Sequence, residues 1–101
     1  MVPLQITYQG LAPSQNLDAA IRRGAERLEP FAGRIAHCNV LVDVAPYHDA
    51  SAPHCLVRVD IATPSGAIAV ANDHPRRALG TEFEAAVTEA FESTVRELEQ
   101  D

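Results

Sequence analysis

Apolar and polar positions alternate at the start of the chain and then repeat at helical spacing. Residues 4–9, LQITYQ, alternate as a half-buried strand does. Ser14 has the chemistry of a helix N-cap, because its hydroxyl can accept a hydrogen bond from a first-turn backbone N–H. From Leu17 the apolar residues follow helical spacing to about Pro30 or Phe31. The first third of the chain therefore predicts a strand followed by a helix.

Alternation returns in the middle of the chain. It predicts strands over 35–44, 54–62 and 67–72, with a tight TPSG turn between the last two. Residues 73–80, DHPRRALG, carry no such pattern and predict a loop. From residue 82 to the end, apolar residues again form one helical stripe.

The element order is β-α-β-β-β-α, and it predicts an α+β fold in one domain, residues 1–101. Each strand has one apolar face and each helix one apolar stripe, so two helices covering one face of a four-stranded sheet would bury both. The expected core is Leu17, Ile21, Leu28, Val40, Val42, Val57, Val59, Phe83, Val87, Phe91 and Leu98. The opposite face of the sheet is expected to stay in water, with Gln5, Thr7, Asn39, Arg58 and Asp60.

Charge is distributed unevenly over this pattern. The net charge is −6, and the chain contains no lysine. Seven acids balance seven arginines in residues 1–81, so the last twenty residues, with seven acids and one arginine, carry the whole surplus. A domain of this charge lacks the general field that attracts nucleic acid or anionic lipid. Binding to RNA would depend on a local group of arginines.

Such a group is present in the first helix and in the loops. The candidate RNA-binding residues are Arg22, Arg23, Arg27, Arg34, Arg58, Arg76 and Arg77. Asp18 and Glu26 flank Arg22 at i±4 and can pair with it, whereas Arg23 and Arg27 have no acid at i±4. The alternative is that these are ordinary solvated surface arginines.

Other chemistry has little support in the sequence. His48, His54 and His74, with Asp49 and Asp73, would gather at one end of the folded sheet, but their spacing matches no zinc motif, so we expect no metal. No serine, histidine and acid are arranged for nucleophilic catalysis, and no glycine-rich phosphate loop is present, so we expect neither an enzyme nor a cofactor.

Cys38 and Cys55 would lie far apart along paired strands, too far for a disulfide. There is no secretory signal or membrane-spanning run, which predicts a cytoplasmic protein.

Several segments together resemble the ribosome hibernation-promoting factor and ribosome-associated inhibitor family. They are LQIT at the first strand, RLEPFAGRI at the end of the first helix, and EFEAAV followed by Phe91, Glu92, Arg96 and Leu98 in the last helix. The resemblance covers nearly the whole chain and depends on the order of the segments, not on one motif.

The resemblance implies a non-catalytic protein that binds the small ribosomal subunit and its ribosomal RNA near the decoding channel, blocks messenger and transfer RNA, and stores idle ribosomes. The chain departs from the family where Gly24, Glu84 and Ser93 replace residues that are usually basic, aromatic and lysine, and where its tail is acidic. A second hypothesis is therefore a regulatory module of the same fold whose acidic C-terminal helix docks on a protein partner.

Overall fold

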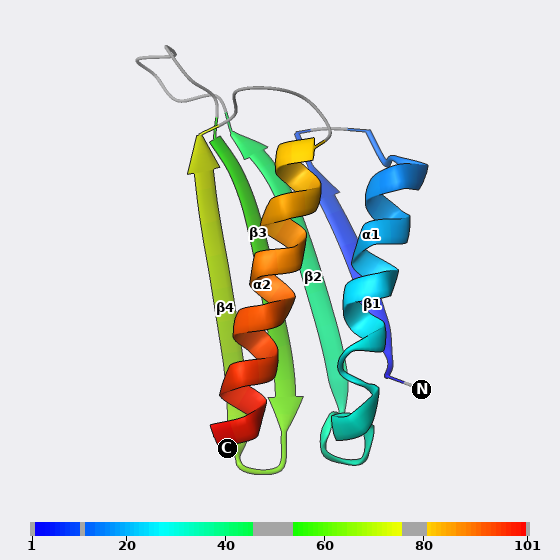
Figure 1. Ribbon diagram of the computed structural model, residues 1–101, viewed down its shortest axis with the longest axis vertical. Coiled ribbons are helices and arrows are strands. Elements are labelled where there is room, and N and C mark those ends of the chain that lie inside the picture. Colours follow the sequence, from blue (N-terminus) through cyan, green and yellow to red (C-terminus); the bar gives the residue numbers. More distant parts are fainter. Residues whose placement is uncertain (1, 11, 46–53, 76–80, 101) are drawn as a thin grey trace.

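A four-stranded sheet carries both helices on one face in the computed structural model, which describes residues 2–10, 12–45, 54–75 and 81–100 (Figure 1). The elements are β1 Leu4–Gln9, α1 Gln15–Glu26, a 3₁₀ helix η1 Glu29–Arg34, β2 His37–Ala45, β3 His54–Thr63, β4 Gly66–Pro75 and α2 Thr81–Gln100. The strand order is β1-β2-β3-β4; β1 and β2 are parallel, and the other neighbours are antiparallel. The predicted α+β fold is confirmed.

Local chemistry explains the two ends of α1. Ser14 is the N-cap, and its Oγ accepts a hydrogen bond from the Leu17 backbone N–H at 3.3 Å. The helix ends at Glu26, so the expectation that it runs to about Pro30 or Phe31 is wrong. Pro30 lacks a backbone N–H, and its ring would clash with the carbonyl of Glu26 in a continued α-helix. The chain continues as the 3₁₀ helix η1 instead.

The β3–β4 connection is the tight turn that the sequence predicts. Thr63 pairs with Gly66 across it, and the Thr63 hydroxyl donates a 2.8 Å hydrogen bond to the Gly66 carbonyl. Gly66 has φ of 141°, a conformation that side chains disfavour. At the far end, β4 continues to Pro75, so the predicted loop over 73–80 begins too early.

The core lies between the sheet and the helices. Every predicted core residue whose side chain the structure describes is buried: Leu17, Ile21, Leu28, Val40, Val42, Val57, Val59, Val87, Phe91 and Leu98. The Phe83 side chain lies outside the described residues. On the opposite face of the sheet Gln5, Thr7, Asn39 and Arg58 are exposed and Asp60 is partly exposed, as predicted.

The strand register separates the two cysteines. Cys38 pairs with Ile61, whereas Cys55 pairs with Val44 near the other end of the same strand pair. Six strand positions correspond to about 20 Å, well beyond disulfide distance. Cys38 is a free thiol in the core, and burial, with a smaller contribution from the charge of Asp60, raises its pKa to about 11. It is therefore a protonated, unreactive thiol at neutral pH.

Candidate nucleic-acid interface

Arg22, Arg23 and Arg27 lie on the exposed side of α1, because the apolar stripe of this helix faces the core. Arg22 is held by its own helix: its Nε lies 2.7 Å from Asp18 Oδ2, in the i, i+4 arrangement that the sequence predicts. Within the described part of the chain, no ion pair or hydrogen bond involves the Arg23 side chain. Arg23 is therefore the most available cation of α1.

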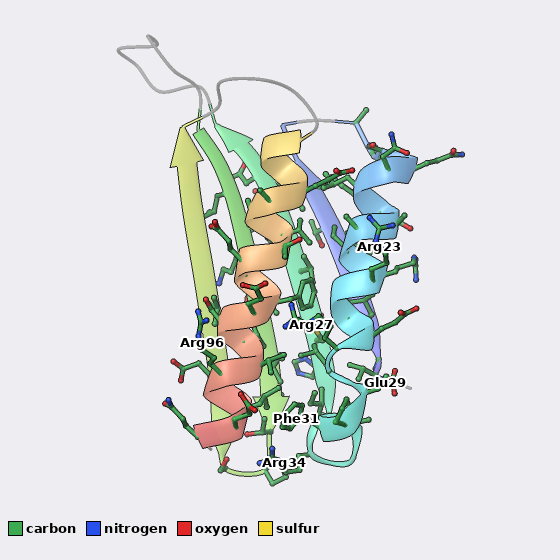
Figure 2. The ribbon with its side chains drawn as sticks, in the orientation of Figure 1. Arg23, Arg27, Glu29, Phe31, Arg34 and Arg96 are labelled. Atoms are coloured by element: carbon green, nitrogen blue, oxygen red, sulfur yellow. The ribbon has the colours of Figure 1, made fainter. Side chains whose placement is uncertain are left out.

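A groove of about 230 Å³ runs between α1 and α2. Arg23 and Arg27 line it from α1, and Glu84 and Thr88 line it from α2. The remaining lining residues are Ala20, Gly24 and Phe91. Figure 2 shows Arg23 on the outer side of α1 and Arg27 toward the space between the two helices. The groove thus combines two cations from one helix with polar and acidic groups from the other.

Gly24 allows the two helices to approach closely at this groove. A Cβ atom placed on Gly24 would lie 2.3 Å from Cδ2 of the Phe91 ring, and Phe91 is fully buried. In the resembled family this position is usually basic, so the departure at Gly24 has a packing explanation here. No local sequence pattern indicates that Gly24 packs against Phe91.

The inner arginine of the groove has a partner on the acidic helix. Arg27 Nη1 lies 3.6 Å from Glu92 Oε1, with about half of each side chain exposed. The sequence places Glu92 four residues before Arg96, where the two side chains could pair. In the structure Arg96 instead donates a 3.1 Å hydrogen bond to the Ser93 hydroxyl. Local spacing did not identify the Arg27–Glu92 pair because it depends on how α1 and α2 pack.

The Arg34 side chain makes contacts that hold parts of the fold together. Its Nη2 donates a 3.1 Å hydrogen bond to the Leu98 carbonyl, and its guanidinium lies 5.3 Å from the centroid of the Phe31 ring. A cation at a helix C-terminus is favourable, because the last carbonyls lack intrahelical partners. Arg34 therefore ties η1 to the end of α2, and contact with RNA would compete with this role (Figure 2).

The other candidate arginines do not join the groove. Arg58 lies on the open face of the sheet, where its Nε is 3.0 Å from Asp60 Oδ1. This face is opposite the one that the helices cover (Figure 1). Arg76 and Arg77 lie outside the described residues. The structure thus brings Arg23 and Arg27 together, places Arg22 beside them on the same helix, and separates Arg58 from all three.

Of the three histidine candidates, the structure describes the backbone of His54 and of His74. Among the residues described, no three histidine, cysteine, aspartate or glutamate side chains gather as metal ligands would. The register pairs His54 with Pro75 and His74 with Cys55, so the two histidines lie near one end of the sheet without being cross-strand partners. His48 and Asp49 lie outside the described residues.

No described helix is both long enough and apolar enough to cross a bilayer.

Comparison by sequence finds no matching family model and no matching curated protein. Comparison by structure finds matches over almost the whole chain. A ribosomal subunit interface protein from Coxiella burnetii matches with a TM-score of 0.76 and 14% identity, over 98% of this chain and 96% of the other. The N-terminal domain of Thermus thermophilus Protein Y matches with a TM-score of 0.67 and 14% identity, over 99% of this chain and 98% of the other.

These matches confirm the resemblance predicted from the sequence at the level of the fold. The likeness covers nearly the whole of each similar structure, despite the low sequence identity. The chain therefore shares its fold with the ribosomal subunit interface protein and with the N-terminal domain of Protein Y.

Proposed function

We propose that this protein is a non-catalytic regulator of translation that associates with the small ribosomal subunit in the cytoplasm. The observation that carries the proposal is the match, over nearly the whole chain, to a ribosomal subunit interface protein and to the N-terminal domain of Protein Y. The sequence supports it independently, through the segments that resemble the hibernation factors. A ribosome is also a partner that an acidic domain can bind through a small local group of cations.

The interhelical groove is the surface that we assign to ribosomal RNA. Arg23 and Arg27 present guanidinium groups, which suit bidentate contact with phosphate oxygens. Arg22 extends the same helix face, although Asp18 neutralises it in part. Two to four phosphate contacts would give a weak salt dependence, with a log–log slope of roughly −0.7 to −0.9 per contact.

The direct test is sedimentation of the purified protein with isolated small and large ribosomal subunits through a sucrose gradient. We expect the protein to migrate with the small subunit at low salt and to dissociate as salt is raised. Migration at the top of the gradient at every salt concentration, with both subunits, would contradict the proposal.

Reversing both charges of the groove should weaken this association. We expect Arg23→Glu with Arg27→Glu to raise the dissociation constant for the small subunit at least tenfold at low salt, which corresponds to about 1.4 kcal/mol. The reason is that both phosphate contacts become repulsive. Binding is measured by sedimentation or by anisotropy of the labelled protein, and thermal melting of each variant verifies folding.

Arg96 supplies a control outside the groove, although Arg96→Glu makes only half the charge change of the double reversal. It lies on α2, outside the residues that line the groove, and its guanidinium contacts Ser93. Arg96→Ala and Arg96→Glu should change the affinity little. Equal losses in the Arg96→Glu variant and the double variant would show that net charge, not the groove, determines binding.

A second candidate function follows from the exposed acids of α2. Glu89, Glu97 and Glu99 are exposed on this helix, and such a face suits a basic protein surface. If the double arginine reversal leaves subunit binding intact while Glu89→Gln with Glu92→Gln abolishes it, the acidic helix is the docking surface. The partner would then be a protein rather than ribosomal RNA.

A further inference from the structure

Two acids of α2 lie in or next to the interhelical groove. Glu92 lies 3.6 Å from Arg27, and the carboxylate of Glu84 belongs to a residue that lines the same groove. Helix α2 thus places one acid beside Arg27 and a second acid in the lining of the groove. Since both helices are packed on one sheet, this arrangement is fixed by the fold.

The Arg27–Glu92 pair is weak enough to be replaced. Its 3.6 Å separation exceeds the usual length of a charge-assisted hydrogen bond. About half of each side chain is exposed, so water and salt screen their attraction. A phosphate group, which has several strong acceptor oxygens, can therefore take the place of the carboxylate on Arg27.

A phosphate on Arg27 would nevertheless lie next to a displaced carboxylate. The phosphate and the Glu92 carboxylate are both negative and would repel each other. This repulsion subtracts from the attraction between the phosphate and Arg27. Within the described part of the chain no acid forms an ion pair with Arg23, so a phosphate on Arg23 does not have to displace a bound carboxylate. The two groove arginines should therefore differ in how much they contribute to binding.

We propose that Glu92 is an intramolecular competitor of RNA for Arg27, so that α2 limits the affinity of α1 for phosphate. This inference rests on the proposed function and adds regulation of the same surface. It assigns a role to the acidic character of α2 that does not need a protein partner. The ligand that competes with Glu92 is the phosphate backbone of RNA.

The test is a gain of binding. Glu92→Gln keeps the length and helical propensity of the side chain and removes its charge. We expect this variant to bind the small subunit about threefold to tenfold more tightly than the unmodified protein at low salt, as expected for removal of one partly screened like charge. The gain should diminish as salt is raised.

Glu99→Gln is the matched control, because it makes the same change in net charge on the same helix. Glu99 is exposed, and the acid that lies beside Arg27 is Glu92. We expect its effect on the affinity to be much smaller than that of Glu92→Gln. Equal gains in the two variants would overturn the proposal, since only the net charge would then matter.

A double-mutant cycle identifies the residue through which Glu92 acts. In an Arg27→Gln background, Glu92→Gln should produce a clearly smaller gain, because there is no longer a guanidinium to release. A gain of the same size in both backgrounds would overturn the proposal. Glu92→Ala serves as a second neutral variant if thermal melting shows that Glu92→Gln is misfolded.

The outcomes separate this inference from the proposed function. If the unmodified protein binds the small subunit and Glu92→Gln binds equally well, the competitor role fails and the proposed function stands. If neither protein binds the subunit, both fail. If Glu92→Gln binds more weakly, the carboxylate itself contacts the partner, and the competitor role is wrong.

Discussion

Val87→Asp is expected to destabilise the protein by about 3 kcal/mol or more. Val87 is 1% exposed and lies in the core between α2 and the sheet. An aspartate there would lose its hydration without a partner, and the methyl contacts of the valine would also be lost. Because the total stability of a small domain is about 5–15 kcal/mol, the change should be plain in a denaturant or thermal unfolding curve.

Ala85→Asp is the control for this substitution. Ala85 lies two residues earlier on α2 and is exposed, so the new carboxylate remains in water. We expect its unfolding midpoint to stay close to that of the unmodified protein. If Val87→Asp has the same midpoint as Ala85→Asp, the packing of α2 on the sheet is wrong.

Gly24→Ala should also destabilise the protein, by about 1–3 kcal/mol, although alanine is normally the better helix former. The added methyl would lie 2.3 Å from Cδ2 and 2.7 Å from Cγ of Phe91. Phe91 is buried on all sides, so its ring cannot move without displacing α2 or the core. The overlap is expected to outweigh the gain in helix propensity, which is about 1 kcal/mol.

Gly33→Ala tests whether this loss comes from the contact or from losing a glycine. Nothing lies within 4 Å of a Cβ atom at Gly33, which is in the exposed 3₁₀ helix η1. We expect Gly33→Ala to leave the stability unchanged or to raise it slightly, since alanine restricts the unfolded chain. A protein stabilised by both substitutions would refute the close packing of α1 on α2.

The fold was predictable because its signals are local. The buried positions of β2 and β3 follow from alternation alone, and the stripe that includes Ile21 follows from helical spacing. Even the error at the end of α1 has a local cause, because Pro30 is visible in the sequence. The extension of β4 to Pro75 was missed because no alternating pattern marks residues 73–75.

The groove was less predictable because its contacts join residues far apart in the chain. The sequence shows that Arg23 and Arg27 have no acid at i±4, but the acid that meets Arg27 comes from α2. Arg34 is a candidate RNA-binding residue by its sequence, but in the structure it bonds the Leu98 carbonyl, 64 positions away in the chain. Such pairs depend on the packing of two helices, which periodicity does not specify.

The parallel pairing at the sheet edge also has a consequence for the order of folding. The β3–β4 hairpin closes a two-residue loop, whereas β1 reaches β2 only after the chain has crossed through α1, bringing Leu4 beside Cys38. Closing the longer segment costs more entropy, so the antiparallel strands should nucleate the sheet and β1 should join late. Pulse-labelled hydrogen exchange would then show the amides of β4 protected before those of β1, and the reverse order would contradict this sequence of events.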